Sequence, residues 1–101
     1  MQTPIVQPRR SFIFTPGLKP EMFPKALASG ADMVCIELED GIAPKDKAAA
    51  RQRALALFET PHADDGVERI LRINSMRERF GIEDVQALLA TDPPPCLLYT
   101  T

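Results

Sequence analysis

Four short runs of apolar and β-branched residues alternate with three helix-like segments, and this alternation most constrains the fold. The runs have the length and composition of strands; they are residues 11–15, 33–38, 68–73 and 96–99. The segments between them have helical spacing or composition; they are residues 21–29, 44–59 and 81–90. A repeated strand–helix order predicts a parallel sheet with right-handed crossovers. An open doubly wound sheet and the first units of a (β/α)8 barrel both fit it.

Proline and glycine residues mark where these segments begin and end. Proline makes up 10 of the 101 residues, about twice its usual ~5% share. Pro20 suits the first turn of a helix, because a missing N–H costs nothing there. Pro24 removes a donor early in the same helix, so we expect a late start or a distorted first turn. Gly30 suits a left-handed stop after this helix.

Length and charge limit the domain count and the partners. With 101 residues the chain holds one domain, which we place at residues 10–101 after an irregular leader at residues 1–9. The net charge of −2 gives no basic excess for nucleic acid. No apolar run has the length of a membrane span or a signal peptide, so we expect a cytoplasmic protein without a membrane partner. Cys35 and Cys96 belong to no CxxC pair, which argues against a structural zinc site.

Polar residues stand at the carboxyl ends of three predicted strands. Thr15 ends the first, Glu39 and Asp40 follow the second, and Arg72 and Asn74 end the third. Ligands of parallel α/β folds bind at this edge, so we expect these residues to converge. An arginine binds a carboxylate through two hydrogen bonds, and carboxylates orient Mg²⁺, usually through water. The pattern favours chemistry on an anionic substrate, with Arg72, Glu39 and Asp40 as the catalytic candidates.

These candidates also have structural interpretations. Glu39 and Asp40 fit a solvated turn in which Asp40 caps the next helix. Arg72 fits a surface ion pair with Glu39 or Glu68. His62 lies in a polar loop, where we expect it to be exposed rather than catalytic.

Cationic residues flank the first two helices. Lys19 and Lys25 lie beside the first loop of the predicted ligand edge, where they could meet a phosphate. The cations around the second helix fit a solvated face; they are Lys45, Lys47, Arg51 and Arg53. The sequence has neither the P-loop spacing nor a GxGxxG motif, so a nucleotide-binding loop is not predicted.

Four stretches of the sequence belong to one known pattern. They are residues 10–17 (RSFIFTPG), 25–32 (KALASGAD), 38–51 (with LEDGIAP and KAAAR) and 71–74 (LRIN). In this order and spacing they resemble the opening of the HpcH/HpaI aldolase and citrate lyase beta-subunit family. The resemblance runs from residue 9 to residue 90 and is nearest to CoA-ester lyases such as the citryl-CoA and malyl-CoA lyases.

The resemblance implies the N-terminal part, three to four βα units, of a TIM barrel of the phosphoenolpyruvate/pyruvate type. Such enzymes cleave or form a carbon–carbon bond next to a CoA thioester or in a keto acid, with Mg²⁺ stabilising an enolate. Arg72 would hold the substrate's oxygen or carboxylate near the metal. Glu39 and Asp40 would orient the groups of that site without binding the metal directly. The family's direct Mg²⁺ ligands lie on later strands, so this chain is expected to supply none. Relatives tend to be homo-oligomers.

The resemblance also locates the CoA ester. Four residues match positions that contact it in malyl-CoA lyases: Phe14, Thr15, Lys19 and Lys25. The family commonly has Asp where this chain has Glu37, and Arg is frequent where it has Lys19. The longer Glu37 should shift packing, and Lys19 cannot make the two-pronged phosphate contact of an arginine.

Three functions fit these observations. The first is the N-terminal part of a Mg²⁺-dependent lyase that cleaves a citryl-CoA, malyl-CoA or citramalyl-CoA type of substrate through an enolate and is inactive alone. The second is a non-catalytic α/β piece that assembles with another chain, because three to four βα units cannot close an eight-stranded barrel. The third is a small independent binding module.

Overall fold

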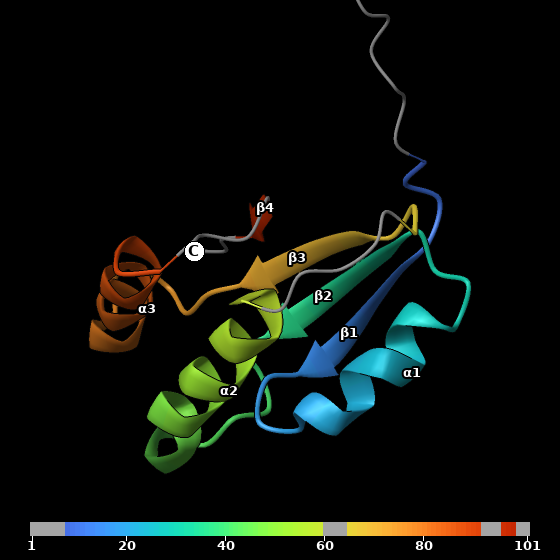
Figure 1. The fold of residues 1–101 in the computed structure, drawn as a ribbon. Coiled ribbons are helices and arrows are strands. Elements are labelled where there is room, and N and C mark those ends of the chain that lie inside the picture. The colour runs from blue at the N-terminus through green and yellow to red at the C-terminus, as the bar shows by residue number, and fades with distance from the viewer. Residues whose placement is uncertain (1–7, 60–64, 92–95, 99–101) are drawn as a thin grey trace, which may run out of the picture.

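The computed structural model describes residues 8–59, 65–91 and 96–98, in which strands and helices alternate (Figure 1). The strands are β1 (Phe12–Pro16), β2 (Met33–Glu37), β3 (Glu68–Arg72) and β4 (Cys96–Leu98). The helices are α1 (Phe23–Leu27), α2 (Lys47–Glu59) and α3 (Arg79–Leu89), with 3-10 turns at Pro20–Met22 and Pro44–Asp46. The predicted strands and helices are therefore confirmed, with ends displaced by a few residues at most. Within these ranges, no helix has both the length and the apolar character needed to cross a membrane.

The four strands form one parallel sheet in the order β1-β2-β3-β4. Each strand pairs with the next one along the chain. A doubly wound sheet instead reverses its strand order at a switch point and carries helices on both faces. The described strands do not reverse, and α1 and α2 lie on the same side of them (Figure 1). Of the two arrangements that the sequence allowed, the structure is the one that opens a TIM barrel.

The main core lies between one face of the sheet and the helices. Val34, Ile36 and Leu71 of β2 and β3 are completely buried on this face. They pack with residues from all three helices: Phe23, Ala26, Ala50, Ala54, Leu55 and Leu88. Because side chains alternate across a strand, the residues between them on β2 and β3 point away from the helices. The helices thus cover one face and leave the other for different contacts.

The prolines shape the start of α1 as predicted. A 3-10 turn occupies Pro20–Met22, and the α-helix begins only at Phe23 with Pro24 in its first turn. The missing N–H of Pro24 is harmless there, because the first N–H groups of a helix have no partner within it. The helix ends at Leu27, before the predicted Ser29, and Gly30 has the expected positive φ of 92°.

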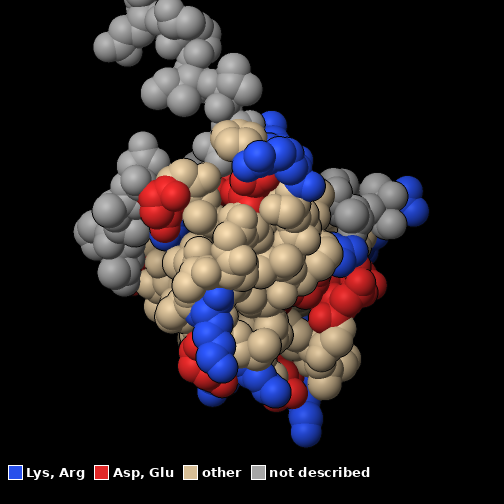
Figure 2. Space-filling model, turned by 90° about the vertical axis from the view of Figure 1, so that its right-hand side faces the viewer, with Lys and Arg blue, Asp and Glu red and all other residues tan. Residues whose placement is uncertain are grey.

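Aromatic side chains stand on the face of the sheet that the helices leave uncovered. Phe12 and Phe14 of β1 are 36% and 52% exposed, and their rings meet edge to face with centroids 4.9 Å apart. Figure 2 shows the side of the molecule on which β1 and α1 lie, where uncharged surface is bordered by charged side chains. Phe14 also lies next to Arg72, which ends β3 at the carboxyl end of the sheet.

Candidate functional site

Arg72 is the centre of a charged cluster at the carboxyl end of the sheet. It ends β3 opposite Glu37 of β2, so both side chains point to the face away from the helices. Its Nη1 donates to Glu37 Oε2 at 2.9 Å and to Asp40 Oδ2 at 3.2 Å. Its Nη2 donates to Glu39 Oε1 at 3.2 Å. The structure therefore brings together the three residues proposed as catalytic, and it adds Glu37 to them.

Glu37 shapes the turn that carries the other two carboxylates. Its Oε1 accepts hydrogen bonds from the backbone N–H of Glu39 at 2.6 Å and of Asp40 at 3.0 Å. Its side chain is only 9% exposed and binds the turn with one oxygen and Arg72 with the other. From the sequence, Glu37 is expected only to shift the packing, because it is longer than the Asp that is common there in the family. The signal that could have identified its role is a carboxylate within an otherwise apolar strand.

The cluster keeps Arg72 firmly charged. Burial by itself lowers the pKa of Arg72, but the hydrogen bond that Arg72 donates to Glu37 and the charges of Glu37, Glu39 and Asp40 raise it above its ordinary value. The Arg72 side chain is 15% exposed, and its guanidinium carbon lies 5.9 Å from the centre of the Phe14 ring. The arrangement is a shielded, permanent cation with carboxylates on one side and an aromatic ring on another.

A pocket of about 350 Å³ opens beside this guanidinium. Its walls combine the end of β1 with the Arg72 cluster; they are Phe14, Thr15, Pro16, Glu37, Asp40, Gly41 and Arg72. The lining combines charged groups, those of Glu37, Asp40 and Arg72, with the aromatic ring of Phe14. Such a site can bind a small anion that also carries an apolar part.

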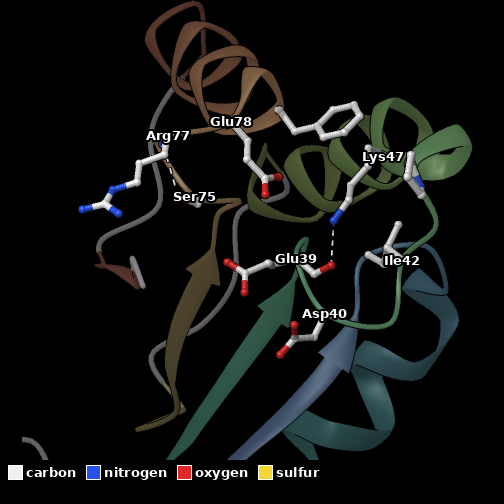
Figure 3. Close-up of a pocket in the computed structure, with 9 residues that line it drawn as sticks. Glu39, Asp40, Ile42, Lys47, Ser75, Arg77 and Glu78 are labelled. Atoms are coloured by element: carbon white, nitrogen blue, oxygen red, sulfur yellow. Dashed lines mark hydrogen bonds between the residues drawn. The ribbon is translucent and has the colours of Figure 1, made fainter. Parts of the chain in front are cut away.

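A second pocket of about 530 Å³ lies on the other side of Glu39 and Asp40 (Figure 3). It separates the loop after β2 from the loop after β3, and Glu78 and Phe80 line its far wall. Lys47 points into the space between them toward the backbone of Glu39, as the close-up shows. Asp40 lines both pockets, and Glu39 lines this one.

The structure does not bring every predicted site residue to the Arg72 cluster. Thr15 is buried and lines the pocket with Phe14, but Lys19 and Lys25 are exposed and lie outside the pocket wall. Lys19 precedes the 3-10 turn, and Lys25 lies on α1. His62 falls outside the described residues.

Several structural interpretations from the sequence are wrong. The turn after Asp40 leads to a 3-10 helix whose N-cap is Ala43, so Asp40 does not cap it. Of the two partners suggested for Arg72, Glu39 is confirmed at 3.2 Å, whereas Glu68 pairs instead with Arg9 at 2.7 Å. Lys47 and Arg51 do not lie on a solvated face, because their side chains turn inward to polar groups of the loop after β3 and of α3. A helix pattern alone cannot show that another element covers these positions.

Mg²⁺ coordination does not fit the described carboxylates. Within the described parts of the chain, no three histidine, cysteine, aspartate or glutamate side chains are grouped so that they could hold a metal ion. Glu37, Glu39 and Asp40 each direct an oxygen to Arg72 instead.

The fold and the position of the cluster define an α/β chain of the TIM-barrel type with a polar site at the carboxyl end of its strands. The chain belongs to the HpcH/HpaI aldolase/citrate lyase family, whose family model matches residues 10–97. The resemblance in the four sequence stretches is thereby confirmed.

Two curated relatives illustrate the similarity. The L-malyl-CoA/beta-methylmalyl-CoA lyase of Cereibacter sphaeroides (strain ATCC 17025) is 40% identical over 87 residues, which are 85% of this chain and 27% of that protein. Citrate lyase subunit beta of Escherichia coli K12 is 31% identical over 81 residues, 80% of this chain and 26% of that protein. The chain therefore spans about a quarter of the length of these relatives.

Solved structures agree on the fold. RipC from Yersinia pestis superposes with a TM-score of 0.64 at 36% identity, over 89% of this chain and 33% of that chain. CitE from Mycobacterium tuberculosis, in complex with magnesium, acetoacetate and coenzyme A, superposes with a TM-score of 0.63 at 35% identity, over 84% of this chain and 31% of that chain. The matched part of each neighbour is about a third of its length.

Proposed function

We propose that this chain carries the N-terminal part of a carbon–carbon lyase site for a CoA ester or a keto acid. The observation that supports this most directly is the Arg72 cation, held at the carboxyl end of the sheet beside a pocket with an aromatic wall. The relatives named L-malyl-CoA/beta-methylmalyl-CoA lyase and citrate lyase subunit beta support it, because both are lyases and the first is named for CoA esters. The proposed reaction is cleavage of a citryl-CoA, malyl-CoA or citramalyl-CoA type of substrate through an enolate.

In this proposal Arg72 anchors an anionic oxygen of the substrate. Asp40 is the most exposed of its three partners, with 74% of the side chain accessible, whereas Glu37 is 9% exposed. A substrate carboxylate can therefore replace Asp40 on Nη1 without disturbing the deeper contact with Glu37. Glu37 and Glu39 then keep the guanidinium plane oriented, which a two-pronged arginine–carboxylate contact requires. Before binding, Asp40 occupies the position that the substrate would take.

The CoA part of the substrate would extend along the β1 side. Phe14 and Thr15 line the pocket beside Arg72, and Lys19 and Lys25 are exposed cations farther along the chain. Phe14 offers an apolar wall to the acyl chain, and the two ammonium groups suit the phosphates of CoA. These four residues form the proposed CoA-binding set.

The proposed cofactor of the complete site is Mg²⁺, which when bound would polarise the substrate's keto oxygen. Glu37, Glu39 and Asp40 are engaged by Arg72, and the described residues form no group that could hold a metal ion, so the metal would be held by other residues. We accordingly expect the 101-residue chain to bind ligand without turning it over.

Isothermal titration of the 101-residue chain with acetoacetate and with coenzyme A tests the site directly. Arg72→Ala should weaken acetoacetate binding at least about ten-fold, because a charged hydrogen-bond partner is lost. Arg79→Ala is the matched control, since Arg79 is an exposed arginine of α3 paired with Glu83. Equal binding by wild type and Arg72→Ala would show that the anchor is elsewhere. An assay with malyl-CoA and Mg²⁺ should show no turnover, and robust turnover would overturn the expectation of binding alone.

A further inference from the structure

Lys47 is the first residue of α2, yet its ammonium group is buried and completely used. The residue is 7% exposed. Its Nζ donates to the carbonyl oxygens of Leu38 at 3.1 Å and Glu39 at 2.6 Å, and to Asn74 Oδ1 at 2.6 Å. An ammonium has three protons, and these three acceptors match them. A lysine whose donors all have buried protein acceptors is a fixed cross-link, unlike the flexible surface lysine that the helix pattern suggested.

Further hydrogen bonds connect Lys47 through Asn74 and Asp84 to Arg51, which lies on the same helix as Lys47. Asp84 of α3 accepts hydrogen bonds from the backbone N–H of Asn74 at 2.9 Å and from its Nδ2 at 2.8 Å. The other oxygen of Asp84 accepts from Arg51 Nε at 2.7 Å. Arg51 follows Lys47 by one turn of α2, so the path returns to the helix where it began. We call these four residues, Lys47, Arg51, Asn74 and Asp84, the polar ring.

A glycine lets α3 approach closely enough to complete the polar ring. A Cβ at Gly81 would lie 2.1 Å from the carbonyl oxygen of Ser75 and 2.7 Å from that of Asn74. These atoms are backbone and cannot move aside cheaply, so the first turn of α3 rests on the loop after β3 only because Gly81 has no side chain. Asp84 lies three residues later and reaches back to Asn74.

The polar ring touches the Arg72 site at one point, which is Lys47. Lys47 binds the carbonyl of Glu39, and the carboxylate of the same residue binds Arg72 at 3.2 Å. Lys47 also binds Asn74, which follows Arg72 by two residues. The Lys47 ammonium therefore binds both the turn that carries Glu39 and Asp40 and the loop that follows Arg72. Arg51 holds α2 to α3 through Asp84, and its contacts do not include Glu39.

We propose that Lys47 is a positioning residue for the Arg72 site. By fixing the Glu39 peptide, it sets the place of the Glu39 and Asp40 carboxylates and thereby the orientation of the Arg72 guanidinium that receives the ligand. This role rests on the proposed function for its ligand, but its geometric part can be measured without one. It predicts that loss of Lys47 changes Arg72, whereas loss of Arg51, whose side chain is also largely covered, affects only the packing of the helices.

The test uses the complete 101-residue chain labelled with nitrogen-15. Lys47→Met keeps the length and the apolar part of the side chain and removes its donors. Arg51→Met is the half-buried control within α2, and Lys45→Met is the exposed control in the 3-10 turn just before α2. The first readout is the NMR signal of the Arg72 Nε–Hε group, and the second is the dissociation constant for acetoacetate.

We expect Lys47→Met to shift the Arg72 signal and to weaken acetoacetate binding about ten-fold, the lower range for residues that orient a binding group. Arg51→Met and Lys45→Met should leave both readouts near wild type. If wild type does not bind acetoacetate, the proposed function fails while the Arg72 signal still decides the role of Lys47. Should Lys47→Met not fold, Lys47→Gln, which keeps an amide donor, is expected to give a smaller change of the same kind. An Arg72 signal in the Lys47 variant that matches the Arg51 variant would overturn the proposal.

Discussion

The two ends of the same sheet use charge in different ways. At the amino end, three ion pairs each join one arginine to one carboxylate; they are Arg9–Glu68, Arg10–Asp32 and Arg69–Asp65. At the carboxyl end, Arg72 meets three carboxylates. The buried Lys47 binds the backbone of Glu39 there, and Arg51 pairs with Asp84. The first arrangement balances its charges pair by pair, and the second gathers them around one cation.

Exposure to water explains why the difference matters. The side chains of Arg9 and Arg10 are 61% and 81% exposed, whereas those of Arg72 and Arg51 are 15% and 12% exposed. Arg69 is the exception at the amino end, because its side chain is 7% exposed while its partner Asp65 is 40% exposed. Exposed pairs are screened and contribute little, so the Arg9 and Arg10 pairs should add little to stability. Buried charges lose hydration, so a cluster of several partly buried charges is costly unless its geometry is well defined. This contrast supports the proposal that the carboxyl end carries the binding site.

The sharpest way to break this comparison is to remove one carboxylate from each end. Asp84→Ala removes the 2.7 Å partner of the largely covered Arg51 guanidinium, which keeps a longer 3.5 Å contact with Glu83, and it removes the acceptor of two Asn74 donors. We expect a loss of about 3–5 kcal/mol in the free energy of unfolding, as for other broken buried ion pairs. Glu68→Ala removes the partner of the exposed Arg9 and should cost about 1 kcal/mol or less. Urea unfolding followed by circular dichroism measures both, and equal losses would contradict the comparison.

The fold and part of the site could be predicted from the sequence. The strand–helix alternation fixes a parallel sheet, and a parallel sheet brings the ends of β2 and β3 together. The sequence therefore predicts that Arg72, Glu39 and Asp40 lie at one edge of the sheet, and the structure joins them by ion pairs. The choice between a doubly wound sheet and a barrel needed the observed strand order, because local patterns do not encode which strands are neighbours.

The remaining site residues depend on contacts that local patterns do not contain. Glu37 matters because the register sets it opposite Arg72, and a register is not visible in either strand alone. Lys47 and Arg51 have the spacing of a solvated helix face, but Lys47 turns inward to the loops after β2 and β3, and Arg51 turns inward to Asp84 of α3. In each case a charged residue acquires its role from an element distant in sequence.

A second comparison, inside the carboxyl end, sharpens the first. Glu37 and Asp40 both bind Nη1 of Arg72, but their side chains are 9% and 74% exposed. Glu37→Gln replaces a buried charged acceptor and weakens its hold on Arg72, so it should cost about 1.5–3 kcal/mol of unfolding free energy. Asp40→Asn should change the stability by about 0.5 kcal/mol or less, as a substitution at an exposed position. Urea unfolding of both variants at pH 7 provides the measurement. If Asp40→Asn proved the costlier change, Asp40 could not be the exchangeable partner of Arg72.

The smallest expected effect is a pH dependence at the amino end. The hydrogen bond from Arg69 lowers the pKa of Asp65 from 3.8 to about 2, and the backbone N–H of Val67 adds to this. A lowered folded-state pKa stabilises the fold at pH values above the ordinary pKa, and this contribution disappears as the pH falls from about 4 to about 2. The Asp65 side chain is 40% exposed, so after screening we expect about 1 kcal/mol or less. The unfolding free energy of Asp65→Asn should therefore lie below that of wild type at pH 6 and approach it near pH 2, with a smaller gap in high salt. A gap in unfolding free energy that stays constant over this pH range would show that the Asp65–Arg69 ion pair is not its source. The charge pairs would then not be what holds the amino end of the sheet together.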